Sequence, residues 1–403
     1  MIDLFKNLKF NDSLFLLTNI LSMPRLLYTL RTTCCVNSLE LTRYDEMLRS
    51  TLGLLVNVDL SQAAWEQASL PINLGGLGIR SAVLLAPSAF LASAAGTTTL
   101  VTSLLPPRLH STVYKSYDSA LIAWKMQALP TCLVPDITIA KYQKVWDNPC
   151  CHCLASDLLD SAQDAPSKAR LMASSMETSG MWLKAIPIAS IGLKLENEAV
   201  RIAVGLRLGV RICEPHICHC GGTVDAYGTH GLACRSSAGR HTRHSQLNDV
   251  IWRSLQRAQI PSAKEPTGLC RTDGKRPDGV TMIPWARGRC LAWDVTVPDT
   301  LAPSHVDESA ARVGSAAAKA EVAKTTKYTN ISMTHIFVPL ALETLGSWGQ
   351  QCIEFVNDLG RRLSQVTGEK LEGFYLKQRL SIAIQRGNSI ACRGTLPSIS
   401  NKH

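Results

Sequence analysis

The chain has 403 residues, 46% of them hydrophobic, so it is long enough for two or three domains with buried cores and is not an intrinsically disordered chain. Its net charge of +10 predicts a polyanionic partner. Fourteen cysteines would suit a disulfide-rich secreted protein, but the N-terminal segment lacks the features of a signal peptide. We therefore expect a reducing compartment, nuclear or cytoplasmic, and no secretion.

Residues 1–130 are predicted to form a helical region, because apolar residues recur three and four apart in 14–33 and 42–55. Ser81–Pro107 carries no charge, but its many Ser and Thr residues and Pro87 make it a poor membrane span, so no membrane partner is expected. The glycines of "LPINLGGLGIR" predict a tight turn, since a phosphate-binding loop would need a preceding strand and a Lys-Ser/Thr ending.

Residues 131–209 are predicted to be a helical linker. Four prolines between residues 130 and 166 loosen the pattern and place a domain boundary between about 130 and 170. Helical periodicity returns in "LENEAVRIAVGLRLG" and ends at Gly209, a plausible C-terminal cap.

A cysteine and histidine cluster follows in 210–236, and its spacing predicts a zinc knuckle. Cys218, Cys220, His230 and Cys234 supply the four thiolate and imidazole ligands that zinc prefers. Cys213, His216 and His219 are competing ligands at this stage, and ordinary reduced cysteines in a turn-rich linker are the alternative interpretation. With all four positions occupied by protein the zinc would be structural and could not activate water.

Basic residues accumulate directly after the knuckle. From Arg235 to Thr300 there are 11 Lys and Arg residues against 6 Asp and Glu residues. A solvated surface would explain this surplus, but a phosphate-binding surface explains it as well. The residues predicted to contact a nucleic acid backbone are Arg235, Arg240, Arg243, Lys275 and Arg276.

Residues 237–403 are predicted to form a small α/β core of helix, three strands, helix and strand. Ser245 is expected to cap the first helix, and "GLCR", "GVTMIPW" and "CLAWDVTV" are expected to be the three strands. The second helix is expected in the alanine-rich stretch 307–328, and the last strand in "THIFVPLAL".

Two carboxylates in this core, Asp278 and Asp294, predict a magnesium site. Magnesium is held by oxygen ligands and can activate water for phosphodiester hydrolysis. Alternation along the strand places Asp294 opposite the apolar face that contains Trp293, an orientation that suits a catalytic site but also plain solvent.

A cation should complete such a site, and Thr296, two residues after Asp294, cannot provide it. The next helix offers Lys319, Lys324 and Lys327. We select Lys324 first and Lys327 second, with a solvated helix face as the alternative.

Three segments together, "CHCGGTVDAYGTHGLACR", "DGKRPDGVTMIPWARGRCLAWDVTVPDT" and "AKTTKY", resemble the C-terminal part of reverse transcriptase proteins from non-long-terminal-repeat retrotransposons that carry a restriction-like endonuclease. The resemblance implies that Asp278 and Asp294 bind the metal, that Lys324 or Lys327 completes the site, and that the knuckle holds zinc. It also implies that the first 130 residues correspond to a polymerase thumb and that DNA and element RNA are the partners.

The sequence therefore predicts an α+β protein with a metal-dependent endonuclease domain that would nick target DNA for target-primed reverse transcription. Because the chain has no Tyr/Phe-x-Asp-Asp tetrapeptide, polymerase activity is not expected from it. The alternatives are a catalytically inactive, nucleic-acid-binding remnant of a reverse transcriptase and a helical scaffold that binds no nucleic acid.

Overall fold

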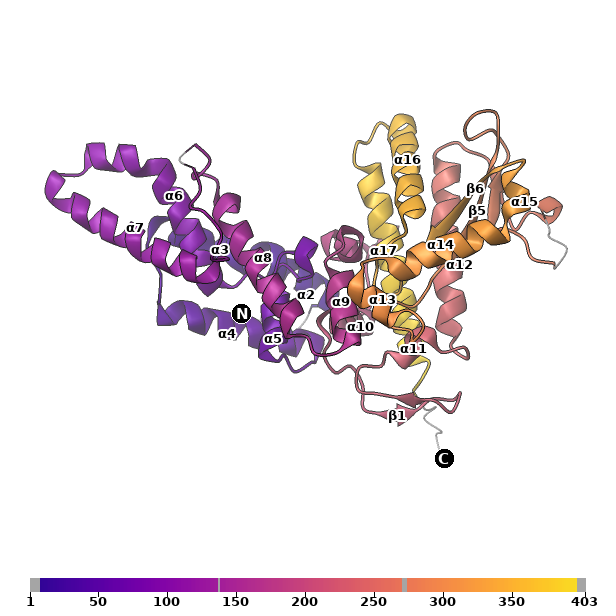
Figure 1. The fold of residues 1–403 in the computed structure, drawn as a ribbon, viewed down its shortest axis with the longest axis horizontal. Helices are drawn as coiled ribbons and strands as arrows, with labels where there is room; N and C mark the ends of the chain where they lie inside the picture. Colours follow the sequence, from indigo (N-terminus) through magenta and orange to yellow (C-terminus); the bar gives the residue numbers. More distant parts are fainter. Residues whose placement is uncertain (1–7, 137, 270–273, 397–403) are drawn as a thin grey trace. The chain divides into compact units, whose positions relative to one another are not determined.

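The computed structural model describes residues 8–136, 138–269 and 274–396, and it confirms the predicted α+β class (Figure 1). The chain divides into two compact units, Met1–Ala162 and Gln163–His403. The boundary between the units lies between residues 130 and 170, where the sequence analysis placed a domain boundary. The finer division into 1–130, 131–209, 210–236 and 237–403 stays a prediction.

The described part of unit 1 consists of helices joined by turns and loops, without a strand. A core cluster gathers around Trp124 and Trp146, whose rings meet edge to face with centroids 5.2 Å apart. Each indole N–H donates to a backbone carbonyl, of Trp146 and Ala140 respectively, so no buried indole donor of this pair is left unsatisfied. The helices and turns are α2 (Phe10–Leu16), η1 (Leu17–Leu21), α3 (Met23–Thr32), α4 (Leu39–Val56), α5 (Gln62–Ser69), η2 (Ile72–Leu74), α6 (Ala82–Leu104), α7 (Pro107–Gln127) and α8 (Gln143–Ser161).

Two details of unit 1 bear on the sequence predictions. The helical stretch 14–33 is interrupted by the π-helical turn η1 (Leu17–Leu21), and Pro24 lies in the first turn of α3. Gly75, Gly76 and Gly78 form a tight turn, as predicted, and the backbone of Gly75 is left-handed. A Cβ at Gly76 would lie 1.9 Å from the carbonyl oxygen of Leu70, so the close approach requires glycine.

Two stretches of unit 1, Phe10–Thr32 and Ala82–Leu104, are long and apolar enough to cross a membrane by length and composition. Core helices and signal sequences meet the same criterion, and 33% and 39% of the two windows are buried in the structure. These helices are weak evidence for a membrane span.

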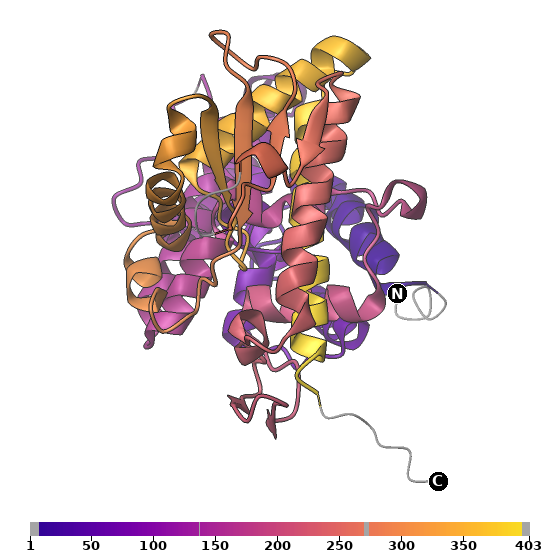
Figure 2. The ribbon, with the colours of Figure 1, turned by 90° about the vertical axis from the view of Figure 1, so that its right-hand side faces the viewer.

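Unit 2 contains the knuckle and a four-stranded sheet between helices (Figure 2). Its first part consists of α9 (Ala165–Ser174), η3 (Glu177–Lys184), η4 (Ala189–Ile191), α10 (Asn197–Leu208), the short strands β1 (His216–Ile217) and β2 (Thr223–Val224), and α11 (His230–Ala233). Its second part consists of α12 (Ala238–Arg257), β3 (Ser262–Lys264), η5 (Thr267–Leu269), β4 (Gly279–Thr281), β5 (Leu291–Thr296), α13 (Val306–Ala311), α14 (Ser315–Lys327), α15 (Thr329–Ser332), β6 (Ile336–Ala341), α16 (Gln350–Thr367) and α17 (Glu372–Arg393). As predicted, α10 ends at Gly209 in a left-handed conformation.

The four-stranded sheet has the order β3-β4-β5-β6, with β3, β4 and β5 antiparallel and β5 parallel to β6. A parallel pair needs a crossover connection, and α13, α14 and α15 form it. Leu291, Trp293 and Val295 of β5 pack on one face against α12, α16 and α17. Ala292 points to the other face, where Tyr328 and Ile331 cover it.

Three local predictions are wrong in this unit. The first helix begins at Ala238 and not after Ser245, because the Ser237 hydroxyl accepts from the Gly239 N–H at its N-terminus. The first strand is β3, earlier than "GLCR"; within "GLCR", Gly268 and Leu269 form a 3-10 turn, whereas 270–271 lie outside the described residues. The alanine-rich helix is broken in two at Gly314, which adopts a φ of 73°.

Candidate functional site

The predicted knuckle residues converge on one point. The ligand atoms of Cys218, Cys220, His230 and Cys234 all lie within 4.8 Å of one another. Cys218 Sγ lies 3.8 Å from Cys234 Sγ, and Cys220 Sγ lies 3.2 Å from His230 Nε2. Two thiolates on one tetrahedral zinc, each about 2.3 Å from the ion, would be about 3.8 Å apart. The group therefore has the chemistry and the size of a metal site.

The competing ligands have other partners. His216 Nε2 lies 3.1 Å from Thr395 Oγ1, and His219 Nε2 lies 3.1 Å from the carbonyl oxygen of Leu396. Cys213 Sγ lies 3.2 Å from the carbonyl oxygen of Asp225. Within the described ranges, the four predicted ligands are the one group of three or more His, Cys, Asp and Glu residues that converges this closely.

One knuckle thiol is polarised toward the thiolate form that binds metal. The backbone N–H of Gly222 donates to Cys220 Sγ at 3.4 Å, and this contact is the main cause that lowers the pKa of Cys220 to about 7. A thiol with this pKa is substantially ionised at neutral pH.

The predicted acid pair, Asp278 and Asp294, lies where β4 begins, beside the middle of β5. Strands β4 and β5 are antiparallel, and Gly279 lies opposite Trp293. The next pair in this register is Asp278 opposite Asp294. The Asp278 carboxylate confirms this closeness, since its Oδ2 accepts a hydrogen bond from the Val295 N–H at 2.6 Å. The two acids of the predicted pair are therefore brought together by the hairpin.

The entry to β4 is fixed by tight packing. A Cβ at Gly279 would lie 2.0 Å from Cζ2 of Trp293, so only glycine lets the strand approach the indole. The indole N–H donates to Asn248 Oδ1 at 2.8 Å, and Asn248 Nδ2 donates to the Asp278 carbonyl at 3.3 Å. Helix α12 thus holds the backbone that carries Asp278.

Asp294 is buried, with 4% of its surface exposed, so the alternative of a solvent-facing strand acid is wrong. Lys324 on α14 forms an ion pair with its Oδ2, and the Tyr328 hydroxyl donates to its Oδ1 at 3.1 Å. Burial raises the pKa of Asp294 above its ordinary value, and the charge of Asp278 raises it further, whereas Lys324 and Tyr328 oppose the rise.

Of the two lysines selected from the sequence, Lys324 contacts Asp294, whereas Lys327 contacts Tyr328. Lys327 Nζ lies 3.2 Å from the Tyr328 hydroxyl, which in turn contacts Asp294. Lys319, the third lysine of the helix, points elsewhere and pairs with Glu308 at 2.6 Å.

Two contributors were not assigned to this site from the sequence. His244 donates from Nε2 to Asp278 Oδ2 at 2.9 Å, and this hydrogen bond is the main cause that raises the pKa of His244. Tyr328 was not assigned any role. The sequence carries a weak signal for both residues, because side chains four positions apart share one helix face. Tyr328 follows Lys324 by four positions, and His244 precedes Asn248 by four.

The predicted nucleic-acid contacts divide into exposed and buried residues. Arg235, Arg240, Lys275 and Arg276 are exposed, and Arg276 pairs with Glu265. Arg243 is only 1% exposed and donates to Asn388 Oδ1 at 2.8 Å and to the Leu232 carbonyl at 2.5 Å. The prediction that Arg243 contacts a DNA backbone is therefore wrong, because its guanidinium joins α12 to α17.

In comparisons with known proteins, no family model matches the chain, and no curated protein matches it either. Any statement of function therefore depends on the geometry of the sites.

Proposed function

We propose that unit 2 is a metal-dependent DNA endonuclease of the restriction-like type, derived from a non-long-terminal-repeat retrotransposon. The observation that carries this proposal is the meeting of Asp278, Asp294 and Lys324 at the β4–β5 hairpin, beneath a crossover helix. Two acids and one cation are the groups that phosphodiester hydrolysis requires. The sheet order and the sequence resemblance support the same class.

The acid pair would hold magnesium. The donor set fits this ion, because two carboxylates on adjacent strands offer the hard oxygen ligands that magnesium takes alongside water and phosphate oxygens. When bound, magnesium neutralises the phosphate and lowers the pKa of a coordinated water. In the structure Lys324 occupies the Oδ2 side of Asp294, so we expect this ammonium to move toward the phosphate in the loaded enzyme.

The remaining residues hold and balance these groups. His244 and the Val295 N–H fix the Asp278 carboxylate, and Tyr328 fixes Asp294 from the opposite side. Lys324, whose side chain is 24% exposed, can reach a phosphate oxygen and stabilise the negative charge that grows as the P–O3′ bond breaks. Cleavage of that bond leaves the 3′-hydroxyl that would prime reverse transcription.

The knuckle would hold a structural zinc ion, and the partners would be DNA and element RNA in the nucleus or the cytoplasm. The exposed cations Arg235, Arg240, Lys275 and Arg276 would bind the backbone phosphates. A zinc ion with four protein ligands stabilises the fold and leaves no position for substrate.

A plasmid-nicking assay with magnesium tests the proposal. Supercoiled DNA should be converted to the open-circular form by the parent protein, and Asp278→Ala and Asp294→Ala should each abolish conversion. Asp307→Ala, which removes an exposed carboxylate on α13, is the matched control and should nick like the parent. Equal nicking by the double variant Asp278→Ala, Asp294→Ala would show that the site is assigned wrongly.

The same preparation separates the enzyme from an inactive remnant. A protein that binds DNA with the usual salt dependence but never nicks it, with magnesium or manganese, is a nucleic-acid-binding remnant. A protein that does not bind DNA at low salt would contradict both interpretations.

A further inference from the structure

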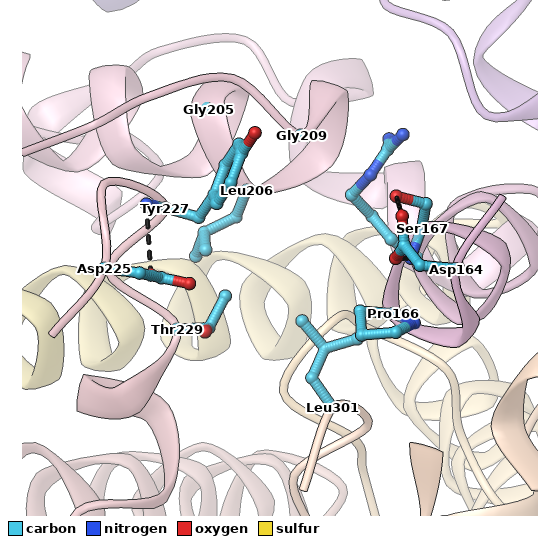
Figure 3. A pocket seen from close by; sticks show the side chains of 11 residues that line it. Asp164, Pro166, Ser167, Gly205, Leu206, Gly209, Asp225, Tyr227, Thr229 and Leu301 are labelled. Carbon is cyan, nitrogen blue, oxygen red and sulfur yellow. Dashed lines mark hydrogen bonds between the residues drawn. The ribbon is translucent and has the colours of Figure 1, made fainter. Parts of the chain in front are cut away.

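A cavity of about 340 Å³ lies beside the knuckle, apart from the acid pair (Figure 3). Its lining residues come from the start of α9, the end of α10, the turn after β2 and the loop before α13. Leu206, Pro166 and Leu301 give it apolar surface, and Tyr227 forms an aromatic wall. Cavities of this size and mixed character are typical of small-ligand sites.

The turn that presents the aromatic wall is held by hydrogen bonds. The Gly228 N–H donates to the Asp225 carbonyl at 3.1 Å, and the Tyr227 N–H donates to Asp225 Oδ1 at 3.1 Å. Gly228 has a φ of 65°, which this turn requires. The N–H of Ile212 donates to the Ala226 carbonyl at 2.8 Å and fixes the turn to the segment after α10. Asp225 therefore keeps Oδ1 inside the turn and directs its other oxygen toward the cavity (Figure 3).

The start of α9, with Asp164 and Ser167, lies on the side of the cavity opposite Tyr227 (Figure 3), and Arg170 of the same helix also lines the cavity. Arg170 Nη1 donates to the Arg207 carbonyl at 2.6 Å at the end of α10. A Cβ at Gly209 would lie 2.4 Å from Arg170 Nε, so glycine is what lets the guanidinium cross the helix end. Asp164 caps α9 by accepting from the Ser167 N–H at 2.7 Å. Both walls are thus held by hydrogen bonds that do not depend on a ligand.

A second hollow, of about 710 Å³, lies next to the first and shares Asp225, Thr229 and Leu301 with it. Its lining adds Arg235, the exposed cation that follows the last knuckle ligand, Cys234. A nucleotide strand that placed a base in the first hollow would therefore have a guanidinium for its phosphate in the second.

We propose that the cavity beside the knuckle binds an unpaired guanine base of a single nucleic acid strand. The base would stack on Tyr227, present the two adjacent N–H groups of its Watson–Crick edge to the one Asp225 oxygen that faces the cavity, and leave its phosphate at Arg235. Single strands are recognised in this way, by aromatic stacking and by hydrogen bonds to exposed base edges. The proposal rests on the proposed function, since it specifies which part of a nucleic acid this nuclease would read.

The chemistry selects guanine among the bases. A carboxylate only accepts hydrogen bonds, and guanine alone offers two adjacent N–H donors on its Watson–Crick edge. In a duplex these donors are paired with cytosine, so base-paired DNA cannot reach the cavity in the same manner. Two carboxylates, of Asp164 and Asp225, outnumber the single guanidinium of the cavity, that of Arg170, whose Nη1 is bonded to the Arg207 carbonyl. The cavity therefore favours a base with N–H donors over a phosphate, and Arg235 in the second hollow is the cation offered to the backbone.

Fluorescence anisotropy with the variant Asp278→Ala, Asp294→Ala, without magnesium, tests the proposal independently of cleavage. The probe is a 12-nucleotide thymidine strand with one central guanine. We expect it to bind more tightly than strands with hypoxanthine, which lacks one donor, or with thymine at that position. Tyr227→Ala should weaken binding of the guanine strand by about 5- to 150-fold. Tyr142→Ala, which removes an exposed tyrosine of unit 1, is the control and should leave binding unchanged.

Asp225→Asn keeps the acceptor that the turn uses and should remove the preference for guanine over hypoxanthine. Equal binding of the three strands, or full binding by Tyr227→Ala, would overturn the proposal. If guanosine monophosphate competes as well as the strand, the cavity serves a free nucleotide and the strand assignment is wrong. Selective guanine binding with no nicking by the parent would reject only the endonuclease, and nicking without selective binding would reject only this cavity.

Discussion

Lys324 of α14 forms an ion pair with Asp294 of β5, although thirty positions of sequence separate them. On the strand itself, the residue two positions after Asp294 is Thr296, which carries no charge and cannot serve as the cation. The crossover helix supplies the charge instead, one turn before Tyr328, which hydrogen-bonds the same carboxylate.

Lys324→Met should reduce nicking by about 10²- to 10³-fold, because the phosphate would lose the cation that stabilises its developing charge. Lys319→Met is the matched control on the same helix, since Lys319 pairs with Glu308 and should be dispensable. Single-turnover nicking rates at saturating magnesium make the comparison. A Lys324→Met protein that nicks as fast as Lys319→Met would remove this lysine from the site.

Arg235→Gln and Arg240→Gln should each weaken DNA binding and reduce the slope of log K against log salt by about 1, as for the loss of one phosphate contact. Arg243→Gln should instead destabilise the fold by about 1–3 kcal/mol, because it leaves Asn388 and the Leu232 carbonyl without their donor. Binding titrations at several salt concentrations and urea unfolding distinguish the two effects. A changed salt slope in a fully stable Arg243→Gln protein would contradict its buried position.

Gly279→Ala should destabilise unit 2 by about 1–3 kcal/mol and reduce nicking, because a Cβ would lie 2.0 Å from the Trp293 ring and force β4 away from β5. Gly268→Ala is the control, since nothing lies within 4 Å of a Cβ there. Thermal unfolding and nicking are measured for both. If Gly279→Ala is as stable and active as Gly268→Ala, the close approach of the hairpin is not what places Asp278.

Glu321 should make the protein less stable as the pH rises. Its carboxylate is 4% exposed and accepts from the N–H groups of Gln351 and Cys352 at the start of α16. Burial raises the pKa of Glu321. The folded state therefore keeps a proton that the unfolded chain has released, and the stability contributed by this group falls as the pH rises from about 4.3 through the raised pKa.

Urea unfolding of Glu321→Gln across pH 4 to 8 measures this effect. The difference in unfolding free energy, parent minus variant, should decrease as the pH rises through that window. Thr326→Ala changes an exposed side chain of α14 that does not titrate, and it should show a constant difference. A parent-minus-Glu321→Gln difference that grows with pH would show that the charged carboxylate is the form stabilised by α16.

Metal analysis should find about one zinc ion per chain, and Cys218→Ser with His230→Ala should lose it and lower the thermal midpoint. Cys213→Ser is the control and should retain zinc, because Cys213 Sγ lies against the Asp225 carbonyl. Full zinc content in the double variant would show that the ion is held elsewhere.

The sequence predicted those parts of unit 2 that depend on local pattern. Alternation along β5 separated Trp293 from Asp294 correctly, and the spacing of the cysteines selected the converging ligands. Glycine at position 209 ended α10 as expected.

Features that depend on contacts between residues far apart in the chain could not be predicted from the sequence pattern. Arg243 looked like one of several exposed cations, but α17 passes over it and buries it. His244 has the same ambiguity, and only the fold of the hairpin back onto α12 brings it to Asp278. The break of the crossover helix at Gly314 comes from a left-handed backbone with a φ of 73°, which apolar periodicity does not record.

The end of α17 has a consequence for the order of synthesis. Asn388 binds Arg243, the segment around Ala391 and Cys392 packs against Gly231 and Gly239, and Thr395 contacts His216 of the knuckle. These partners lie about 145 to 180 positions earlier in the chain, and such long-range contacts form late. During synthesis Arg243 of α12 and His216 of the knuckle segment therefore lack these partners until α17 and Thr395 have been made. The packing of α12 and the knuckle segment is therefore complete only once α17 has been made.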